Sequence, residues 1–265
     1  MSASRTLAAA RALFEAHERR ERFGALPSEL VPRTPEEAYL VQDDFVAMRA
    51  QRLGAVSGYK IALSTPAMQK FVGVGEPMAG TMLYSTLRRS PCAVKASDYV
   101  NLIVEFEIAV ELAEDLPAID APFGRERVAA TVGAVMPAIE LADDRGADYT
   151  SLSRHPLELI ADNCWNEGTV LGESRTDWRQ TDLAAVRGSA RINGVLAGRG
   201  LGADTMGHPL AALAWVADNL AARGRGMVRG DIVITGSLVT TKQARAGDLI
   251  SWEIDELGAV ELRVE

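Results

Sequence analysis

The stretch VEFEIAVEL, residues 104–112, is the most informative part of the chain. Apolar side chains alternate there with glutamate or alanine, and this period of two predicts a half-buried β-strand. Side chains two positions apart on a strand share a face, so Glu105 and Glu107 should lie side by side, with their Cα atoms roughly 7 Å apart. The simplest interpretation of the pattern is a strand with one face in water.

A third glutamate has an apolar setting. Glu140 ends the stretch MPAIE (136–140) and is followed by Leu141, so an unpaired charge there would be costly. Carboxylate oxygens are the ligands that Mg²⁺ and Mn²⁺ prefer. Glu105, Glu107 and Glu140 are therefore candidate ligands of a divalent cation. Two different interpretations stay open: a solvent-facing strand, and a metal-free arrangement in which the glutamates bind waters or a lysine.

Composition excludes several classes of protein. The chain has 265 residues, a net charge of −8 and a pI near 5.1, which argues against nucleic acid or an anionic membrane as partner. No apolar run reaches the ~18 residues of a membrane span. Arg5, Arg11 and Glu15 interrupt the first residues, unlike a signal peptide. Cys92 and Cys164 are the two cysteines, too few for a disulfide framework. We expect a cytoplasmic protein.

The pattern along the chain predicts an α+β fold. Residues 1–55 are expected to form a helical region, with a second helix that begins after Thr34-Pro35 and ends near Gly54. Residues 56–265 are expected to form a β-rich core that makes one structural unit with the helices. Another helix is expected between His208-Pro209 and Gly224. The expected strands are Val56–Ile61, Tyr99–Glu114, Ala130–Leu141, Gly168–Leu171, Ala190–Ile192, Asp231–Thr235, Leu249–Ile254 and Ala259–Val264.

Other segments could carry chemistry. The chain has no G-x-S-x-G element for serine-type catalysis, and its three histidines have no evident partner. Lys60 lies in an apolar, strand-like stretch directly after Gly58-Tyr59. A lysine there usually extends to the surface, but beside a metal site it could stabilise an enolate oxygen. Residues 73–81 form a glycine-rich loop, either a plain connector or a segment that closes over a pocket.

Several of these motifs occur together in one order. They are GYKIAL (58–63), GVGEPMAGT (73–81), EFEIAVEL (105–112), MPAIE (136–140), ADN (161–163) and GDIVITGSL (230–238). In this respect the chain resembles the 2-keto-4-pentenoate hydratase family, within the fumarylacetoacetate hydrolase superfamily. The resemblance runs from about Pro35 to the end of the chain. It implies a helical N-terminal region packed on a mixed, mostly antiparallel β-roll core.

The resemblance also implies a site. Glu105, Glu107 and Glu140 would hold Mg²⁺ or Mn²⁺, and Lys60 matches the family's active-site lysine. The substrate would be a small 2-oxo acid from the degradation of aromatic compounds. A metal-stabilised enolate would allow hydration, and it would equally allow decarboxylation or C–C bond hydrolysis. A homo-oligomer is expected.

This chain departs from the family's pattern around the expected pocket. Met78 stands where the hydratases carry an acidic residue, two positions before the Gly80-Thr81 pair, and Glu76 is a possible substitute. After Asn163 the family shows small residues, whereas this chain has Cys164-Trp165. We therefore expect Met78, Gly80, Thr81, Asn163 and Trp165 in the substrate pocket. The departures also fit a non-catalytic relative that keeps the metal.

Overall fold

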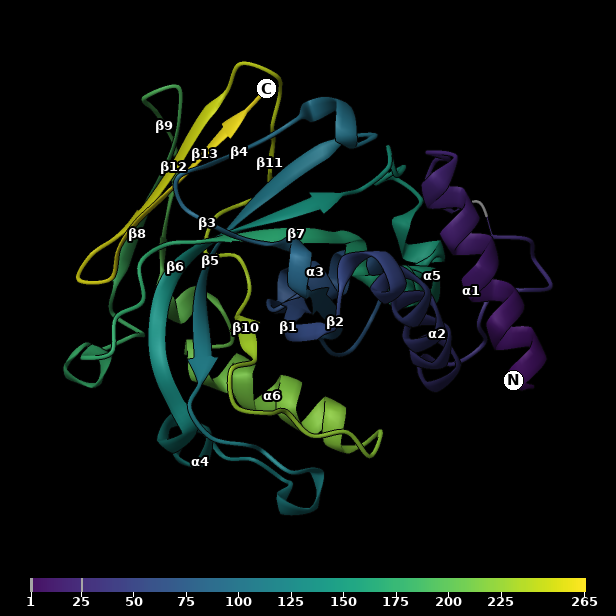
Figure 1. The fold of residues 1–265 in the computed structure, drawn as a ribbon, viewed down its shortest axis with the longest axis horizontal. Coiled ribbons are helices and arrows are strands. Elements are labelled where there is room, and N and C mark those ends of the chain that lie inside the picture. Colours follow the sequence, from purple (N-terminus) through teal and green to yellow (C-terminus); the bar gives the residue numbers. More distant parts are fainter. Residues whose placement is uncertain (1, 25) are drawn as a thin grey trace.

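In the computed structural model, which describes residues 2–24 and 26–265, two β-sheets pack together and helices lie beside and below them (Figure 1). The main sheet has the order β2 (Met78–Leu83), β1 (Val56–Ala62), β10 (Ile232–Ile234), β5 (Leu102–Leu112), β6 (Val132–Asp143), β7 (Asn166–Leu171) and β3 (Leu87–Arg89), and β11 (Lys242–Gln243) also pairs with β5. The second sheet has the order β4 (Cys92–Val94), β13 (Gly258–Val264), β12 (Leu249–Ile254), β8 (Arg187–Ile192) and β9 (Val195–Leu201). The helices are α1 (Ala3–Glu18), α2 (Pro35–Leu53), α3 (Pro66–Val72), α4 (Arg125–Thr131), α5 (Pro156–Ala161) and α6 (Pro209–Ala221).

Most strand pairs are antiparallel. The parallel pairs are β1 with β10, β3 with β7, and β13 with β4. The prediction of a mixed, mostly antiparallel α+β fold with a helical N-terminal region is confirmed. The C-terminal hairpin is also present, since β12 and β13 pair from Leu249–Arg263 to Ile254–Gly258.

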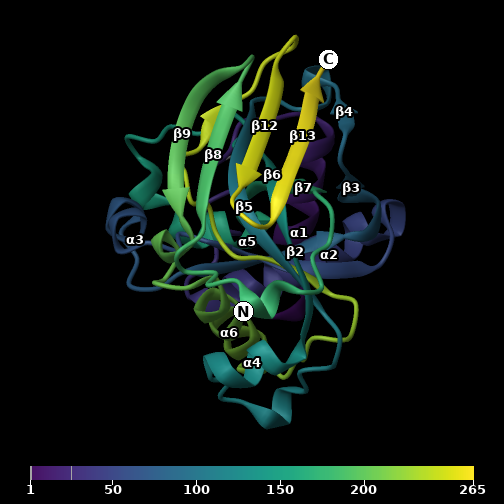
Figure 2. The same cartoon turned by 90° about the vertical axis from the view of Figure 1, so that its left-hand side faces the viewer.

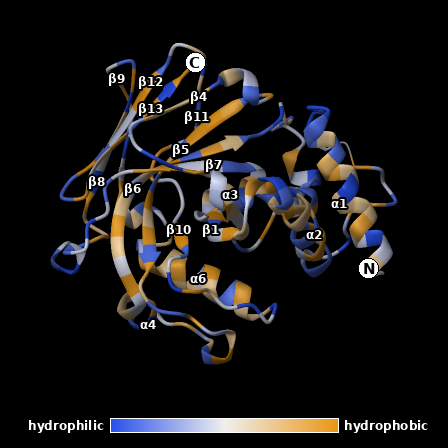
Figure 3. Ribbon diagram, in the orientation of Figure 1, coloured by the Kyte–Doolittle hydropathy of each residue, from blue (hydrophilic) through white to orange (hydrophobic). Residues whose placement is uncertain are grey.

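The alternation in β5 separates two environments. Its apolar side chains on one face, Val104, Phe106, Ile108 and Val110, belong to the large cluster between the sheets and α6. Glu105 and Glu107 therefore point to the opposite face. The apolar character of β5, β6 and α6 is visible in Figure 3. The solvent-facing interpretation of this strand is wrong for Glu107, because its side chain is fully buried.

A tryptophan connects the second sheet to β5. Figure 2 shows β9, β8, β12 and β13 side by side. Trp252 on β12 is fully buried, and its Nε1 donates a hydrogen bond of 2.9 Å to the main-chain oxygen of Glu107. Gly188 on β8 leaves room for the indole, since a Cβ there would lie 1.9 Å from a ring carbon. The packing of Trp252 thus fixes the strand that carries Glu105 and Glu107.

Local signals set the helix ends that the sequence predicts. The Thr34 hydroxyl accepts a hydrogen bond from the Glu37 N–H at 3.2 Å at the start of α2. Gly54, with φ of +83°, ends this helix. His208 caps α6, since its Nδ1 accepts from the Leu210 N–H at 3.0 Å.

Several elements differ from the sequence prediction. Residues 73–81 are not a loop throughout, because Met78 already begins β2. Every residue of β2 is buried, so both its faces are covered and no alternation marks it as a strand. The helices α3, α4 and α5 have six or seven residues. Such short segments hold too few turns for a recognisable helical period.

The N-terminal helices lie against the β-core through apolar and polar contacts. Leu13 of α1 and Phe45 of α2 share a buried cluster with Leu159 of α5. Gln42, fully buried on α2, donates from Nε2 to the main-chain oxygens of Ala79 (2.9 Å) and Ile160 (2.7 Å). None of the helices in the described ranges is long and apolar enough to span a membrane.

A buried network of charges joins the same two parts. His17 of α1 donates from Nε2 to Asp162 Oδ1 at 2.6 Å. Arg145 pairs with Asp162 at 2.8 Å, and Arg49 of α2 donates to Glu167 at 2.9 Å. Burial opposes the charge on His17, but Asp162 and Glu167 outweigh it and raise its pKa above 6.5. Burial likewise opposes the charge on Glu167, yet Arg49 and His17 lower its pKa to about 2.

The His17 pKa gives a pH dependence with a definite sign. Because the folded protein binds the His17 proton more tightly than the unfolded chain does, this contribution to stability is complete below pH 6.5. It is lost as pH rises through the folded-state pKa, while Asp162 and Glu167, whose pKa values are lowered, stay ionised. We expect the free energy of unfolding of His17→Gln, measured in urea, to decline less than wild type across that window. An identical slope in both proteins would contradict this.

We also expect residues 1–55 and 56–265 to unfold in one transition.

Candidate metal centre and substrate cavity

The pairing of β5 with β6 brings the three glutamates together. The antiparallel register sets Glu105 directly opposite Glu140, and Glu107 follows two residues along β5. Oxygen atoms of all three carboxylates lie within 4.8 Å of one another. Glu107 and Glu140 are fully buried, and Glu105 is partly exposed at the cavity. The fold therefore brings together the three residues that the sequence indicates as candidate ligands.

Each carboxylate accepts a hydrogen bond from a residue outside the three glutamates. Thr241 donates from its hydroxyl to Glu105 Oε1 at 2.8 Å. The Gly236 N–H donates to Glu107 Oε2 at 2.6 Å, and Asn166 Nδ2 donates to Glu140 Oε1 at 2.8 Å. Outer hydrogen bonds of this kind hold metal-ligating carboxylates in a fixed orientation. None of these three donors was predicted from the sequence.

We call the carboxylates of Glu105, Glu107 and Glu140 the metal cup, and their remaining oxygen atoms can bind a cation. Glu107 Oε1 and Glu140 Oε2 are buried and have no hydrogen-bond partner among the described residues. Burial, together with the neighbouring carboxylates, raises the pKa of Glu107, and burial and Glu105 raise the pKa of Glu140. Buried, mutually repelling carboxylates with free oxygens are stabilised by a divalent cation, and a set of three carboxylates suits Mg²⁺ or Mn²⁺.

Lys60 lies beside the cup on β1. Its Nζ is 3.1 Å from Glu140 Oε1 and 3.5 Å from the main-chain oxygen of Cys164. Burial opposes its charge, but Glu140, Glu105 and Glu107 outweigh burial and raise the pKa of Lys60. The side chain is therefore an ammonium group at neutral pH. It can donate hydrogen bonds and balance negative charge, but it is not a base.

An unusual turn closes the site above Lys60. Asn163, Cys164 and Trp165 are three consecutive residues in the left-handed region, with φ of 53°, 49° and 63°. The turn is held by Asn163, which accepts from the Thr81 N–H at 2.7 Å and donates to the Thr81 oxygen at 2.8 Å. It presents the Cys164 carbonyl to Lys60. Gly80 permits this approach, because a Cβ there would lie 2.9 Å from Lys60 Cγ.

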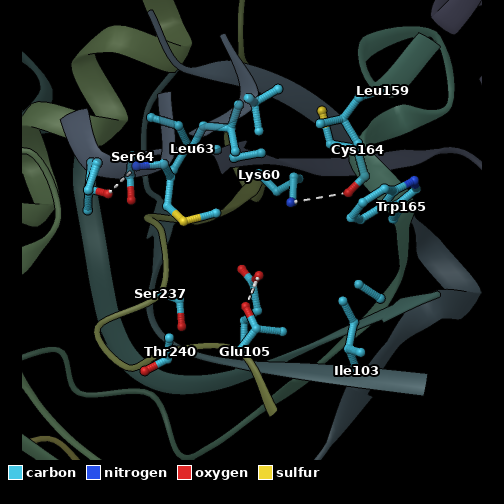
Figure 4. Close-up of a pocket in the computed structure, with 18 of the residues that line it drawn as sticks. Lys60, Leu63, Ser64, Ile103, Glu105, Leu159, Cys164, Trp165, Ser237 and Thr240 are labelled. Atoms are coloured by element: carbon cyan, nitrogen blue, oxygen red, sulfur yellow. Dashed lines mark hydrogen bonds between the residues drawn. The ribbon is translucent and has the colours of Figure 1, made fainter. Parts of the chain in front are cut away.

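A cavity of about 490 Å³ opens in front of Lys60 and Glu105, which face each other across it (Figure 4). Such a volume is typical of small-molecule sites. Hydroxyl groups from the loop after β10 and apolar side chains from β5, α3 and α5 form its walls. Its lining includes Ser64, Met68, Val72, Ile103, Tyr149, Leu152, Leu159, Trp165, Asp204, Ser237, Thr240 and Thr241.

The residues expected in the pocket have different positions. Trp165 lines the cavity. Gly80, Thr81 and Asn163 do not line it, and they support the turn that contacts Lys60. Met78 is buried in the apolar cluster under the N-terminal helices. Glu76 is exposed and is not among the lining residues. Ile103, Tyr149 and Leu159 were missed. Ile103 precedes Glu105 by two positions on the same strand face, a signal that could have identified it.

Residues 64–265 match the model of the fumarylacetoacetate (FAA) hydrolase C-terminal family. The chain belongs to this family. Among curated relatives, the 2-keto-4-pentenoate hydratase of Paraburkholderia phymatum is 33% identical over 223 residues, 84% of this chain and 83% of that protein. The 2-oxo-hept-4-ene-1,7-dioate hydratase of Escherichia coli is 28% identical over 96% of both chains.

A solved structure supports the same assignment. The 4-oxalocrotonate decarboxylase of Pseudomonas putida G7, complexed with magnesium and adipate, superposes with a TM-score of 0.90. The two chains are 25% identical, and the match covers 100% of this chain and 99% of that one. The fold expected from the resemblance is therefore confirmed over the whole chain.

The cup geometry predicts how metal affinity responds to substitution. Glu107→Gln should lower Mn²⁺ affinity, measured by calorimetry, at least about 100-fold, since ligands contribute more than the 10–100-fold typical of their outer partners. Thr241→Val, which removes the donor to Glu105, should lower it about 10-fold. Glu111→Gln, on the same strand but outside the cup, is the matched control. Wild-type affinity in Glu107→Gln would contradict the assignment.

Proposed function

We propose that this chain is a Mg²⁺- or Mn²⁺-dependent hydratase that adds water to a small 2-oxo-alkenoate produced in the degradation of aromatic compounds. The observation that carries the proposal is the convergence of three carboxylates and the Lys60 ammonium at one end of a cavity of about 490 Å³. Membership of the family and the similarity to hydratases over most of the chain support it.

The chain's own residues divide the work. Glu105, Glu107 and Glu140 would hold the cation, which when bound supplies Lewis acidity toward the oxygen atoms of a 2-oxo acid. Lys60, kept charged by the surrounding carboxylates, donates hydrogen bonds to a substrate oxygen as negative charge develops on it. Much of the cavity wall is apolar, and a less polar surrounding strengthens that interaction.

Proton transfer to the rest of the substrate needs another group. Met78 has no titratable proton and is buried away from the cavity, and Glu76 is exposed outside it. Besides Lys60 and Glu105, the titratable groups among the described lining residues are Tyr149, Asp204 and the thiol of Cys164. The Tyr149 hydroxyl donates to Asp144 at 2.9 Å, and burial and Asp144 raise its pKa. Tyr149 is the first candidate for the proton donor because it lines the cavity, and transfer to the substrate would require its hydrogen bond to Asp144 to break.

A second candidate function is decarboxylation of a 2-oxo acid. The TM-score of 0.90 with a decarboxylase and the position of Met78 favour it. Loss of CO₂ needs charge stabilisation at the metal end but no addition of water further along the substrate. A C–C bond hydrolase or a non-catalytic protein that keeps the cup would use the same three carboxylates, so turnover has to distinguish them.

Turnover measurements separate these functions. With Mg²⁺ added, we expect the purified protein to consume a 2-hydroxy-2,4-dienoate, followed by its ultraviolet absorbance, without release of CO₂. Lys60→Gln should lower kcat/KM by about 10²–10³ because a donor to the developing charge is lost. Lys70→Gln, which changes an exposed lysine on α3, is the control. Release of CO₂ would favour the decarboxylase, and binding of oxalate without turnover would favour the non-catalytic relative.

We also propose that the protein is cytoplasmic and forms a homo-oligomer. The exposed side chains of Tyr84 and Val228 line one surface hollow, and apolar side chains gathered in one place support association between copies. Light scattering of the purified protein should give a mass that is a multiple of 28.4 kDa. A monomer mass at micromolar concentration would contradict this.

A further inference from the structure

We propose that the 2-oxo acid taken by this site ends in an uncharged, apolar tail and not in a second carboxylate. This inference rests on the proposed function, because it assumes that the 2-oxo acid end lies at the metal cup. The names of the two hydratases above describe a monoacid and a diacid, so family membership leaves the tail open. The walls of the cavity distinguish the two.

Lys60 and Glu105 are the charged lining groups at the metal-cup end of the cavity. These two side chains face each other (Figure 4). Glu107 and Glu140, which have carboxylate oxygens within 4.8 Å of Glu105, are not among the lining residues. Away from this end, one wall is apolar, and Figure 4 shows Ile103, Leu159 and Trp165 on that side of the cavity. Leu152, Met68 and Val72 also line the cavity. A tail that extends from the cup therefore meets hydrocarbon and an indole ring.

A second carboxylate would have no cationic partner in this cavity. Among the described residues that line it, Lys60 is the one lysine, arginine or histidine. Its ammonium group already pairs with Glu140 at 3.1 Å. A carboxylate placed against the apolar wall would lose its water without gaining a counter-charge, which is strongly unfavourable. A methyl or methylene group in the same place gains from burial.

The hydroxyl-bearing side of the cavity has no cationic lining residue for an anionic tail either. Ser237 donates its hydroxyl proton to the main-chain oxygen of Val239 at 2.7 Å, and Thr241 donates to Glu105. Asp204 lines the cavity as a further negative group. Asp204 and Glu105 add negative charge to the lining, which disfavours an anionic tail and favours an uncharged one.

Binding of a matched pair of acids tests the inference without relying on turnover. The probes are 2-oxohexanoate and 2-oxoadipate, which share chain length and differ in a terminal methyl or carboxylate, with oxalate as a reference that has no tail. Calorimetry with the Mg²⁺-loaded protein should give an affinity for 2-oxohexanoate at least about tenfold above that for 2-oxoadipate. Oxalate should bind as well, because it needs only the cup.

One substitution should reverse the preference. Met68 lies on α3, lines the cavity and is 42% exposed, so an arginine can be placed there without disturbing the core. Met68→Arg should strengthen binding of 2-oxoadipate at least about fivefold and weaken binding of 2-oxohexanoate, because it adds the missing cation. Met68→Leu should keep the wild-type preference.

The outcomes distinguish a failure of the inference from a failure of the proposed function. Binding of oxalate together with equal or tighter binding of 2-oxoadipate in the wild type would overturn the inference and leave the proposed function intact. Failure of oxalate and both 2-oxo acids to bind in the presence of Mg²⁺ would overturn the proposed function and the inference together. A preference for 2-oxohexanoate that Met68→Arg reverses supports the inference.

Discussion

The antiparallel pairing of β5 with β6, in a register that sets Glu105 opposite Glu140, is the constraint on which the site depends. A shift by one residue would turn Glu105 and Glu107 toward the apolar core and expose Phe106 to the cavity. Two features oppose such a shift. The apolar face of β5 is packed against the second sheet, and Trp252 is bonded to the main chain of Glu107. The same contacts therefore stabilise the packing of the two sheets and fix the geometry of the metal cup.

The sequence predicts local structure correctly where one pattern has one physical cause. The period of two in β5 follows from a strand with different environments on its faces, and it correctly predicted that Glu105 and Glu107 share a face. Thr34 and Gly54 marked the ends of α2 for equally local reasons. The apolar setting of Glu140 made it a candidate ligand, and the resemblance to a family then assigned Glu140 and Lys60 to the same site as this pair, because no local pattern could give their proximity.

The cavity walls could not be obtained in the same way. Ile103, Tyr149 and Leu159 come from separate segments, and as single residues they look like ordinary core or loop positions. Gly80 and Thr81 were expected to touch the substrate, but they act behind Lys60, because β2 is buried on both faces. A pattern in the sequence indicates which residues belong to one helix or strand, whereas the lining of a cavity depends on how several helices and strands pack together.

The left-handed turn at Asn163–Trp165 has a consequence for how such a site can diversify. Its backbone is held by the two hydrogen bonds between Asn163 and Thr81, and no side-chain hydrogen bond of Trp165 contributes to it. The side chain of Trp165 packs against Phe23 and Tyr149, so a change at position 165 acts through this packing, while the hydrogen bonds of Asn163 hold the turn that meets Lys60. The choice is restricted, because left-handed backbone costs most residues roughly 1–2 kcal/mol and disfavours β-branched ones in particular. Valine, isoleucine and threonine are thus poor replacements. Residues without a branch at Cβ can occupy position 165, and substitutions among them would change the shape of the cavity and the range of substrates.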